Sequence, residues 1–171
     1  MQDATVIGID PGSRHTGWGV VREHSGVLTL VECGVIHTSS QGEKVFSERL
    51  AHIYRELSQV LTRLLPQEAA VEQVFTAHNA ATALKLGQAR GVAVAACAGM
   101  GLPISDYEPT LVKKTLVGTG RAEKEQVQYM VARLLGVAHP QWALDTSDAL
   151  GIAICHLTLR RYAALTQKTR L

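Results

Sequence analysis

The short stretch VIGIDPG, residues 6–12, constrains the fold of this chain more than any other. Its β-branched apolar run is typical of a buried strand, and Pro11-Gly12 ends the strand and turns the chain. Asp10 then lies at the carboxyl end of the strand, where an open α/β sheet presents its ligands. An Asp before Pro-Gly is also ordinary turn chemistry. This stretch alone therefore leaves a turn-former and a site residue equally open.

The composition is that of a folded protein with a small net charge. The chain has 171 residues, 46% of them hydrophobic, which is enough for a sizeable core. A net charge of +2 means that any nucleic-acid surface is a local patch. The three cysteines are far apart and match no metal or disulfide pattern, which favours a reducing cytoplasm. We expect no secretory signal and no membrane partner, because the most apolar stretch, residues 91–102, is short and glycine-rich.

Hydrophobic patterns predict one α/β domain, residues 1–165, with a mixed sheet. A turn signal at residues 24–26 makes the first three strands an antiparallel meander. Each later strand follows a helix, which favours parallel crossover pairing. Residues 166–171 form a polar basic tail that we expect to fray. The predicted strands are residues 4–10, 16–22, 27–38, 69–74 and 102–107, and the predicted helices are residues 45–65, 80–100, 109–117, 123–135 and 144–165.

Two of these helices carry further expectations. Asn79 can cap helix 80–100, whose many Ala and Gly residues permit close approach of another backbone. Packing against its own sheet and a subunit interface both remain open, and enlarging Ala89 or Ala93 would test the interface. In helix 123–135, the residues predicted to face inward are Val127, Met130, Val131, Leu134 and Leu135.

Four carboxylates from three distant segments are predicted to meet if the last helix packs across the sheet. Asp10 and Glu72 lie at or near the ends of two strands, and Asp145 and Asp148 share one helix face. Such a cluster repels itself without a cation, and oxygen ligands favour Mg²⁺ or Mn²⁺ over zinc. Two such ions would activate a water and stabilise the leaving oxygen of a phosphodiester. Ordinary alternatives are helix capping for the Asp pair and a water-facing edge position for Glu72.

With these acids in place, the sequence resembles the RuvC family of Holliday-junction resolvases over nearly its whole length. The resemblance implies a ribonuclease-H-like fold, with a five-stranded mixed sheet flanked by helices on both faces. Gly87 and Arg90 belong to the family signature, but we assign them no chemistry from the sequence. The segments that carry the resemblance are GIDPGSRHTGWGV (8–20), VEQVF (71–75), NAATALKLGQARG (79–91), VKKTLVGTGRAEKEQV (112–127) and ALDTSDALGIAICH (143–156).

The resemblance implies a Mg²⁺-dependent DNA endonuclease. It would resolve four-way junctions by paired symmetric nicks in recombination and repair, leaving 5′-phosphate and 3′-hydroxyl ends. Two Mg²⁺ ions per active site are implied, with Mn²⁺ able to substitute. The implied catalytic and metal-binding residues are Asp10, Glu72, Asp145 and Asp148.

DNA contacts are also implied. Phe75 matches an aromatic that stacks on an unpaired base, and Lys113 and Lys124 match basic residues that contact DNA or support cleavage. Asn79 and Arg121 are further DNA-binding candidates, Arg121 because it lies in a basic run around a glycine-rich break. The alternatives are solvent exposure for the basic residues and core burial for Phe75.

Partners follow from the same resemblance. A four-way junction has approximate two-fold symmetry, so a homodimer supplies two matching active sites. The RuvA–RuvB branch-migration complex is the implied protein partner, in the cytoplasm. Three other functions were weighed as alternatives. An actin-like or sugar-kinase-like ATPase opens with a similar strand and turn but needs a duplicated domain. A related RNA nuclease shares the fold, and a junction-binding scaffold would need no acid cluster.

Overall fold

The computed structural model describes residues 3–38, 45–73, 79–138 and 140–168. Within these residues ten elements follow one another, in the order predicted from the sequence. They are β1 (Ala4–Asp10), β2 (His15–His24), β3 (Val27–His37), α1 (Phe46–Leu64), β4 (Glu68–Glu72), α2 (Ala80–Gly99), β5 (Ile104–Tyr107), α3 (Pro109–Val117), α4 (Lys124–Leu134) and α5 (Leu144–Lys168).

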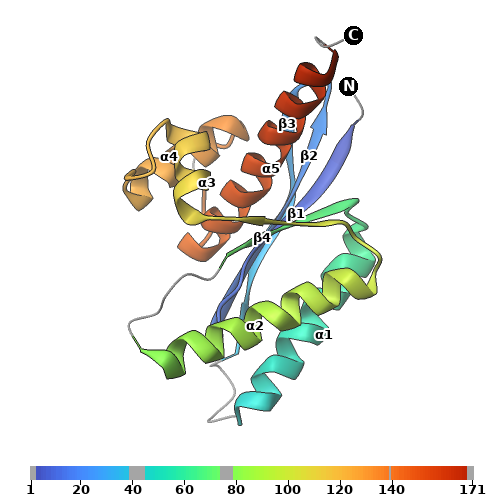
Figure 1. The fold of residues 1–171 in the computed structure, drawn as a ribbon, viewed down its shortest axis with the longest axis vertical. Helices are drawn as coiled ribbons and strands as arrows, with labels where there is room; N and C mark the ends of the chain where they lie inside the picture. The colour runs from blue at the N-terminus through green and yellow to red at the C-terminus, as the bar shows by residue number, and fades with distance from the viewer. Residues whose placement is uncertain (1–2, 39–44, 74–78, 139, 169–171) are drawn as a thin grey trace.

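The strands form one mixed sheet in the order β3-β2-β1-β4-β5 (Figure 1). β2 pairs antiparallel with β1 and β3, while β4 pairs parallel with β1 and β5. At the β2–β3 turn, Ser25 and Gly26 have φ of 51° and 84°, as in a type I′ hairpin, whose twist matches that of the strands. The predicted meander is confirmed. Glu72 lies on an inner strand, so the edge-strand alternative for it was wrong.

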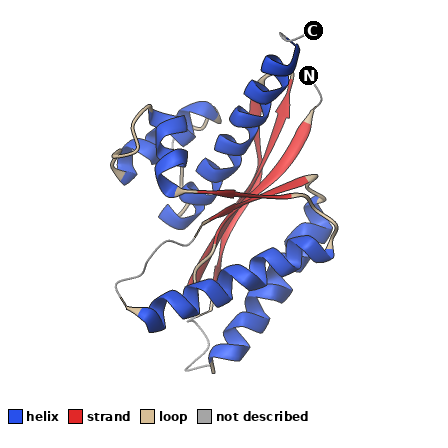
Figure 2. Cartoon of the chain, viewed as in Figure 1, coloured by secondary structure: helices blue, strands red, loops and turns tan. Residues whose placement is uncertain are grey.

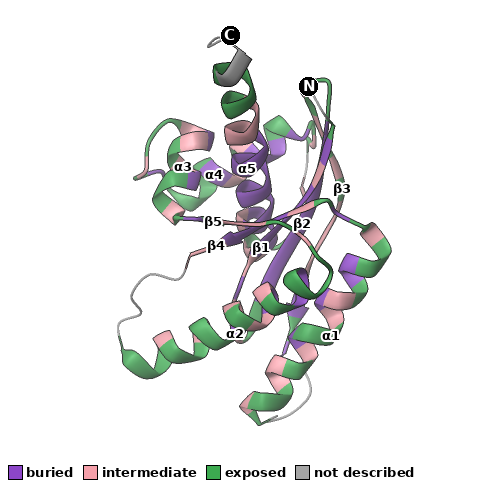
Figure 3. Ribbon diagram, turned by 45° about the vertical axis from the view of Figure 1, so that its right-hand side comes forward, coloured by how far each residue is buried: buried purple, intermediate pink, exposed green. Residues whose placement is uncertain are grey.

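The two faces of the sheet carry separate helical layers. α1 and α2 cover one face, and α3, α4 and α5 cover the other (Figures 1 and 2). Alternation along β1 sends Ile7 and Ile9 toward α1 and α2, and Val6 toward α5. Figure 3 shows the burial concentrated in the sheet and in the middle of α5. The same alternation directs Asp10, at the end of β1, to the α5 side.

Glycines on β1 and β2 let α5 lie very close to the sheet. A Cβ at Gly8 would lie 2.0 Å from the carbonyl oxygen of Ala149, and a Cβ at Gly17 would lie 2.0 Å from that of Asp145. Real Cβ atoms essentially never come so close, so any side chain here would force the helix away. Gly17 pairs with Asp10 across the β1–β2 register. This contact therefore holds the start of α5 beside Asp10.

A buried polar network joins α5 to β4 and β5. His156 of α5 is only 6% exposed. Its Nδ1 lies 2.8 Å from the Tyr107 hydroxyl, and its Nε2 lies 2.8 Å from Glu68 Oε2. Arg160 Nε lies 2.9 Å from the other Glu68 oxygen. Because buried polar groups are costly when unpaired, this network fixes how α5 lies along the sheet.

We expect His156→Leu to lower the free energy of unfolding by about 2–4 kcal/mol, because the Tyr107 hydroxyl and a Glu68 oxygen lose their partner. Urea unfolding followed by circular dichroism measures the change. His52→Leu is the matched control, since the His52–Glu56 pair on α1 is long, at 4.0 Å. It should lose less than about 1 kcal/mol. Equal losses in the two variants would contradict a stabilising role for the network.

Two local expectations differ from the structure. Leu134 was predicted to face inward but is 41% exposed, because Leu135 takes the inward position one turn after Val131. The last helix continues to Lys168, so residues 166–168 are helical where we expected a frayed tail.

Ala89 and Ala93, which we chose from the sequence to test a subunit interface on α2, were the wrong positions. Ala89 and Ala93 are both 0% exposed and pack in the core formed with α1 and the sheet. Leucine at either position would disturb that core rather than a subunit interface. The glycines on the other side of the helix, Gly87 and Gly91, have open space where a Cβ would lie. An interface on α2 would lie on this exposed side of the helix.

Candidate active site

Asp10 and Glu72 lie side by side because their strands are parallel neighbours. β1 and β4 pair with Ile9 opposite Val71, so the two acids follow at the same sheet edge. Both are the last residues of their strands. Each of the two carboxyl groups acts on the pKa of the other. The predicted meeting of the first two acids is therefore present in the structure.

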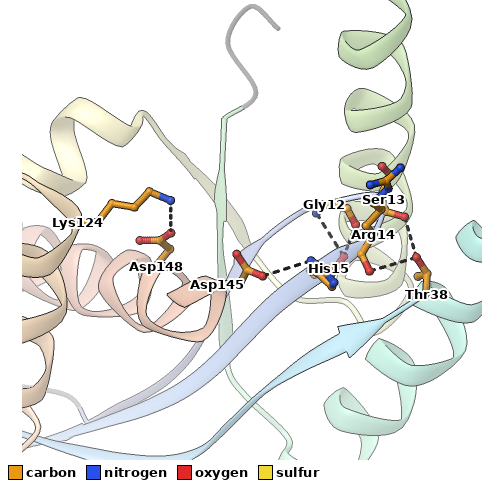
Figure 4. A network of polar contacts seen from close by, with 9 residues as sticks. Gly12, Ser13, Arg14, His15, Thr38, Lys124, Asp145 and Asp148 are labelled. Atoms are coloured by element: carbon orange, nitrogen blue, oxygen red, sulfur yellow. Dashed lines mark hydrogen bonds and ion pairs between the residues drawn. The ribbon is translucent and has the colours of Figure 1, made fainter. Parts of the chain in front are cut away.

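α5 carries the second pair of acids to the same edge. Asp148 lines a pocket of about 350 Å³ together with Asp10 and Glu72. Asp145, in the first turn of α5, lies beside this pocket, and its charge also acts on Asp10. Figure 4 shows Asp145 and Asp148 on α5. The expected convergence of four carboxylates from three segments is thus observed, with Asp145 at the margin.

Burial and mutual repulsion dominate the electrostatics of this cluster. Burial, followed by the neighbouring charge of Glu72, raises the pKa of Asp10 to about 8. Burial also raises the pKa of Glu72, opposed by the hydrogen bond with Asp10, and it raises the pKa of Asp148, opposed by the charge of Lys124. The protein alone therefore does not stabilise all these charges, and a cation would.

Two lysines complete the pocket. Lys124, at the start of α4, has its Nζ 3.7 Å from Asp148 Oδ2 (Figure 4). Lys113 of α3 lines the pocket, and its charge opposes the rise in the pKa of Glu72 that burial causes. A capping box between Glu123 and Gln126 fixes the first turn of α4, and so the position of Lys124. Both lysines predicted from the sequence therefore lie beside the acids.

Neither Arg121 nor Asn79, two of the other predicted DNA contacts, lines the pocket. Arg121 is exposed and does not line it. Asn79 caps α2, as predicted, with its side-chain oxygen accepting a hydrogen bond from the Thr82 N–H at 2.8 Å. Phe75 lies outside the described residues. The DNA contacts of all three residues remain predictions.

The donor set fits a hard divalent cation. Among the described residues, no three His, Cys, Asp or Glu side chains already form a metal-binding group. Asp10, Glu72 and Asp148 nevertheless line one pocket and offer only oxygen donors. Oxygen ligands at a self-repelling site are typical of Mg²⁺ and Mn²⁺.

The turn between β1 and β2, predicted at Pro11-Gly12, is held by side-chain hydrogen bonds. Thr16 Oγ1 donates to the Gly12 carbonyl at 2.8 Å, and Thr38 Oγ1 donates to the Ser13 carbonyl at 2.8 Å. His15 leaves this turn with its Nδ1 3.9 Å from Asp145 Oδ2 (Figure 4). The only signal in the sequence was that His15 follows the Asp10 turn. It brings a third basic group to the edge of the cluster.

Known proteins resemble this chain over almost its full length. The family model described as Crossover junction endodeoxyribonuclease RuvC matches residues 6–156. The RuvC of Lawsonia intracellularis is 64% identical over 164 residues, covering 96% of each chain. The RuvC of Oleidesulfovibrio alaskensis is 63% identical over 164 residues, again covering 96% of each.

A solved structure agrees in fold as well as in sequence. T. thermophilus RuvC in complex with a Holliday junction substrate superposes with a TM-score of 0.86 at 35% identity, covering 94% of this chain and 96% of that one. The chain belongs to the RuvC family of crossover junction endodeoxyribonucleases. Membership confirms the predicted ribonuclease-H-like fold and the predicted class of enzyme, an endodeoxyribonuclease. No described helix is long and apolar enough to cross a membrane.

Proposed function

We propose that this enzyme resolves four-way (Holliday) junctions by paired symmetric nicks during recombination and repair. One observation carries the proposal: four carboxylates from three segments gather at one sheet edge, with two lysines beside them. Phosphodiester cleavage needs negative charge to be stabilised on the attacking and leaving oxygens, and such a site supports this chemistry once it holds cations. The junction bound by the similar T. thermophilus RuvC supports the choice of substrate.

We infer that the acids hold two Mg²⁺ ions, for which Mn²⁺ can substitute. Asp10 and Glu72 would hold the ions together with Asp145 and Asp148, through oxygen donors that suit both metals. The bound ions would supply Lewis acidity for attack by water and for departure of the leaving oxygen, giving 5′-phosphate and 3′-hydroxyl ends.

The remaining pocket residues bind and orient the DNA. Lys113 and Lys124 are available for phosphates that enter the pocket. Val112, Val127 and Ile152 form an apolar wall, which lowers the local dielectric constant and strengthens interactions among the charged groups.

Further DNA contacts belong to the same proposal. Phosphate contacts position the DNA on the protein without reading its sequence. Arg121 would contact phosphates beyond the pocket, and Asn79 would lie near the DNA at the start of α2. Phe75 would stack on an unpaired base, an interaction worth about 1–3 kcal/mol.

The proposed enzyme acts as a homodimer, since two nicks of like polarity require two equivalent active sites. The exposed face of α2 around Gly87 and Gly91 is the candidate interface, because no described residue lies within 4 Å of the place where a Cβ at either glycine would be. We further propose that residues 1–165 form one nuclease domain, which works in the cytoplasm beside the RuvA–RuvB branch-migration complex.

Substrate selectivity tests the proposal. Wild-type protein should nick a synthetic four-way junction, at symmetric positions in two strands, far faster than a linear duplex that contains the same arm sequences. Strand-specific end labels identify the nicks, and light scattering measures the mass of the active species. Equal cleavage of junction and duplex would contradict junction selectivity. Tight junction binding without nicks in any metal would instead favour the scaffold.

A further inference from the structure

Arg90 of α2 contacts the end of β4 and the neighbouring strand β5. Its Nε donates to the backbone carbonyl of Glu72 at 3.1 Å. Its Nη2 lies 2.5 Å from Asp106 Oδ1 on β5. The side chain is 26% exposed, so most of it is covered by protein. One guanidinium therefore joins α2 to the ends of two neighbouring strands.

The Glu72 carbonyl lacks a backbone donor, because the residue that follows β1 is a proline. The Gln73 N–H donates to the Tyr107 carbonyl of β5 at 2.8 Å, so the Glu72 carbonyl, one residue earlier, points toward β1. The pairing of β1 with β4 stops at Val71. One step further, the donor facing the Glu72 carbonyl would be the backbone nitrogen of Pro11, which carries no hydrogen.

We propose that Arg90 is a positioning residue for Glu72, supplying the hydrogen-bond donor that Pro11 lacks. It holds the last peptide group of β4, and so sets the direction in which the Glu72 side chain enters the site. Asp106 in turn holds the guanidinium from β5. This inference rests on the proposed role of Glu72 as a catalytic, metal-binding acid. The inference also assigns Arg90, in the GQARG segment (residues 87–91), a structural role that is separate from contact with DNA.

The test compares Arg90→Gln with Arg63→Gln. Arg63 is a matched control because its guanidinium also makes two contacts, but both are with Glu32 of β3, which is not part of the active-site pocket. We expect Arg90→Gln to lower the single-turnover rate at saturating junction by about 10–100-fold, as for other groups that orient metal ligands. Arg90→Lys should not restore the rate, since lysine lacks the rigid fork. Arg63→Gln should cleave like wild type.

A second readout does not depend on cleavage. The carboxyl carbon resonance of Glu72, assigned by its loss in Glu72→Gln, should shift in metal-free Arg90→Gln and stay unchanged in Arg63→Gln. An unchanged Glu72 resonance overturns the proposal, even if wild-type protein proves not to cut junctions. A loss of junction affinity with an unchanged resonance would make Arg90 a DNA contact instead. If Arg90→Gln fails to fold, Asp106→Asn must shift the Glu72 resonance, and no shift there overturns the proposal.

Discussion

Asp10→Asn is expected to reduce the single-turnover cleavage rate of a four-way junction by about 10³-fold or more, while junction binding is retained. Asp10 is the acid on which the other three carboxylates act, and an amide cannot replace its charge toward a cation. Binding survives because both pocket lysines, Lys113 and Lys124, remain available to phosphates. Gel shift measures the binding, and end-labelled strands measure the cleavage.

The same substitution should stabilise the metal-free protein. A buried carboxyl group beside other carboxyl groups destabilises the folded state, and the neutral amide of Asn destabilises it less. The urea midpoint of Asp10→Asn should therefore lie above that of wild type without metal. Asp3→Asn is the control, since Asp3 is exposed and paired with His24 away from the pocket. Cleavage by Asp10→Asn at the rate of Asp3→Asn would contradict the catalytic assignment.

Gly17→Ala is expected to lower cleavage by about 100-fold although no functional group is lost. The added Cβ would lie 2.0 Å from the Asp145 carbonyl oxygen, so β2 or the start of α5 must move. That movement displaces Asp145, and overpacking of this kind also costs about 1–3 kcal/mol of folding stability. Single-turnover rates and urea unfolding measure the two effects.

Gly99→Ala is the matched control for this substitution. Gly99 is the last residue of α2, and a Cβ there would meet nothing within 4 Å. Alanine in a helix is favoured over glycine by about 0.5–1 kcal/mol, so this variant should be as stable as wild type or more so. If Gly17→Ala cleaved as fast as Gly99→Ala, the close contact between β2 and α5 would have no role in positioning the acids.

The acids could be predicted because each has a local signal. Asp10 ends an apolar run before Pro-Gly, Glu72 ends a short strand, and Asp145 and Asp148 are three residues apart on one helix. Strand ends at one sheet edge and one helix across them then bring the carboxylates together. Sheet geometry predicted that the acids could meet, and the family resemblance gave them their implied role.

The supporting residues could not be predicted, because their roles arise between distant segments. Gly17 matters only because the Asp145 backbone lies against it. Arg90 matters only because Pro11 lacks a donor opposite β4, which depends on the register of two strands. Ala89 and Ala93 are small residues of the kind that also occur where helices of two subunits meet. Only their burial shows that this side of α2 faces the core.

The most direct test of the central claim is single-turnover cleavage of a strand-labelled four-way junction in Mg²⁺, Mn²⁺ or EDTA. The four-acid site predicts paired symmetric nicks with 5′-phosphate ends in either metal, and none in EDTA. The nicks should also disappear in Glu72→Gln, whose substitution leaves both pocket lysines in place. Cleavage that persists in EDTA would contradict a metal-dependent carboxylate centre.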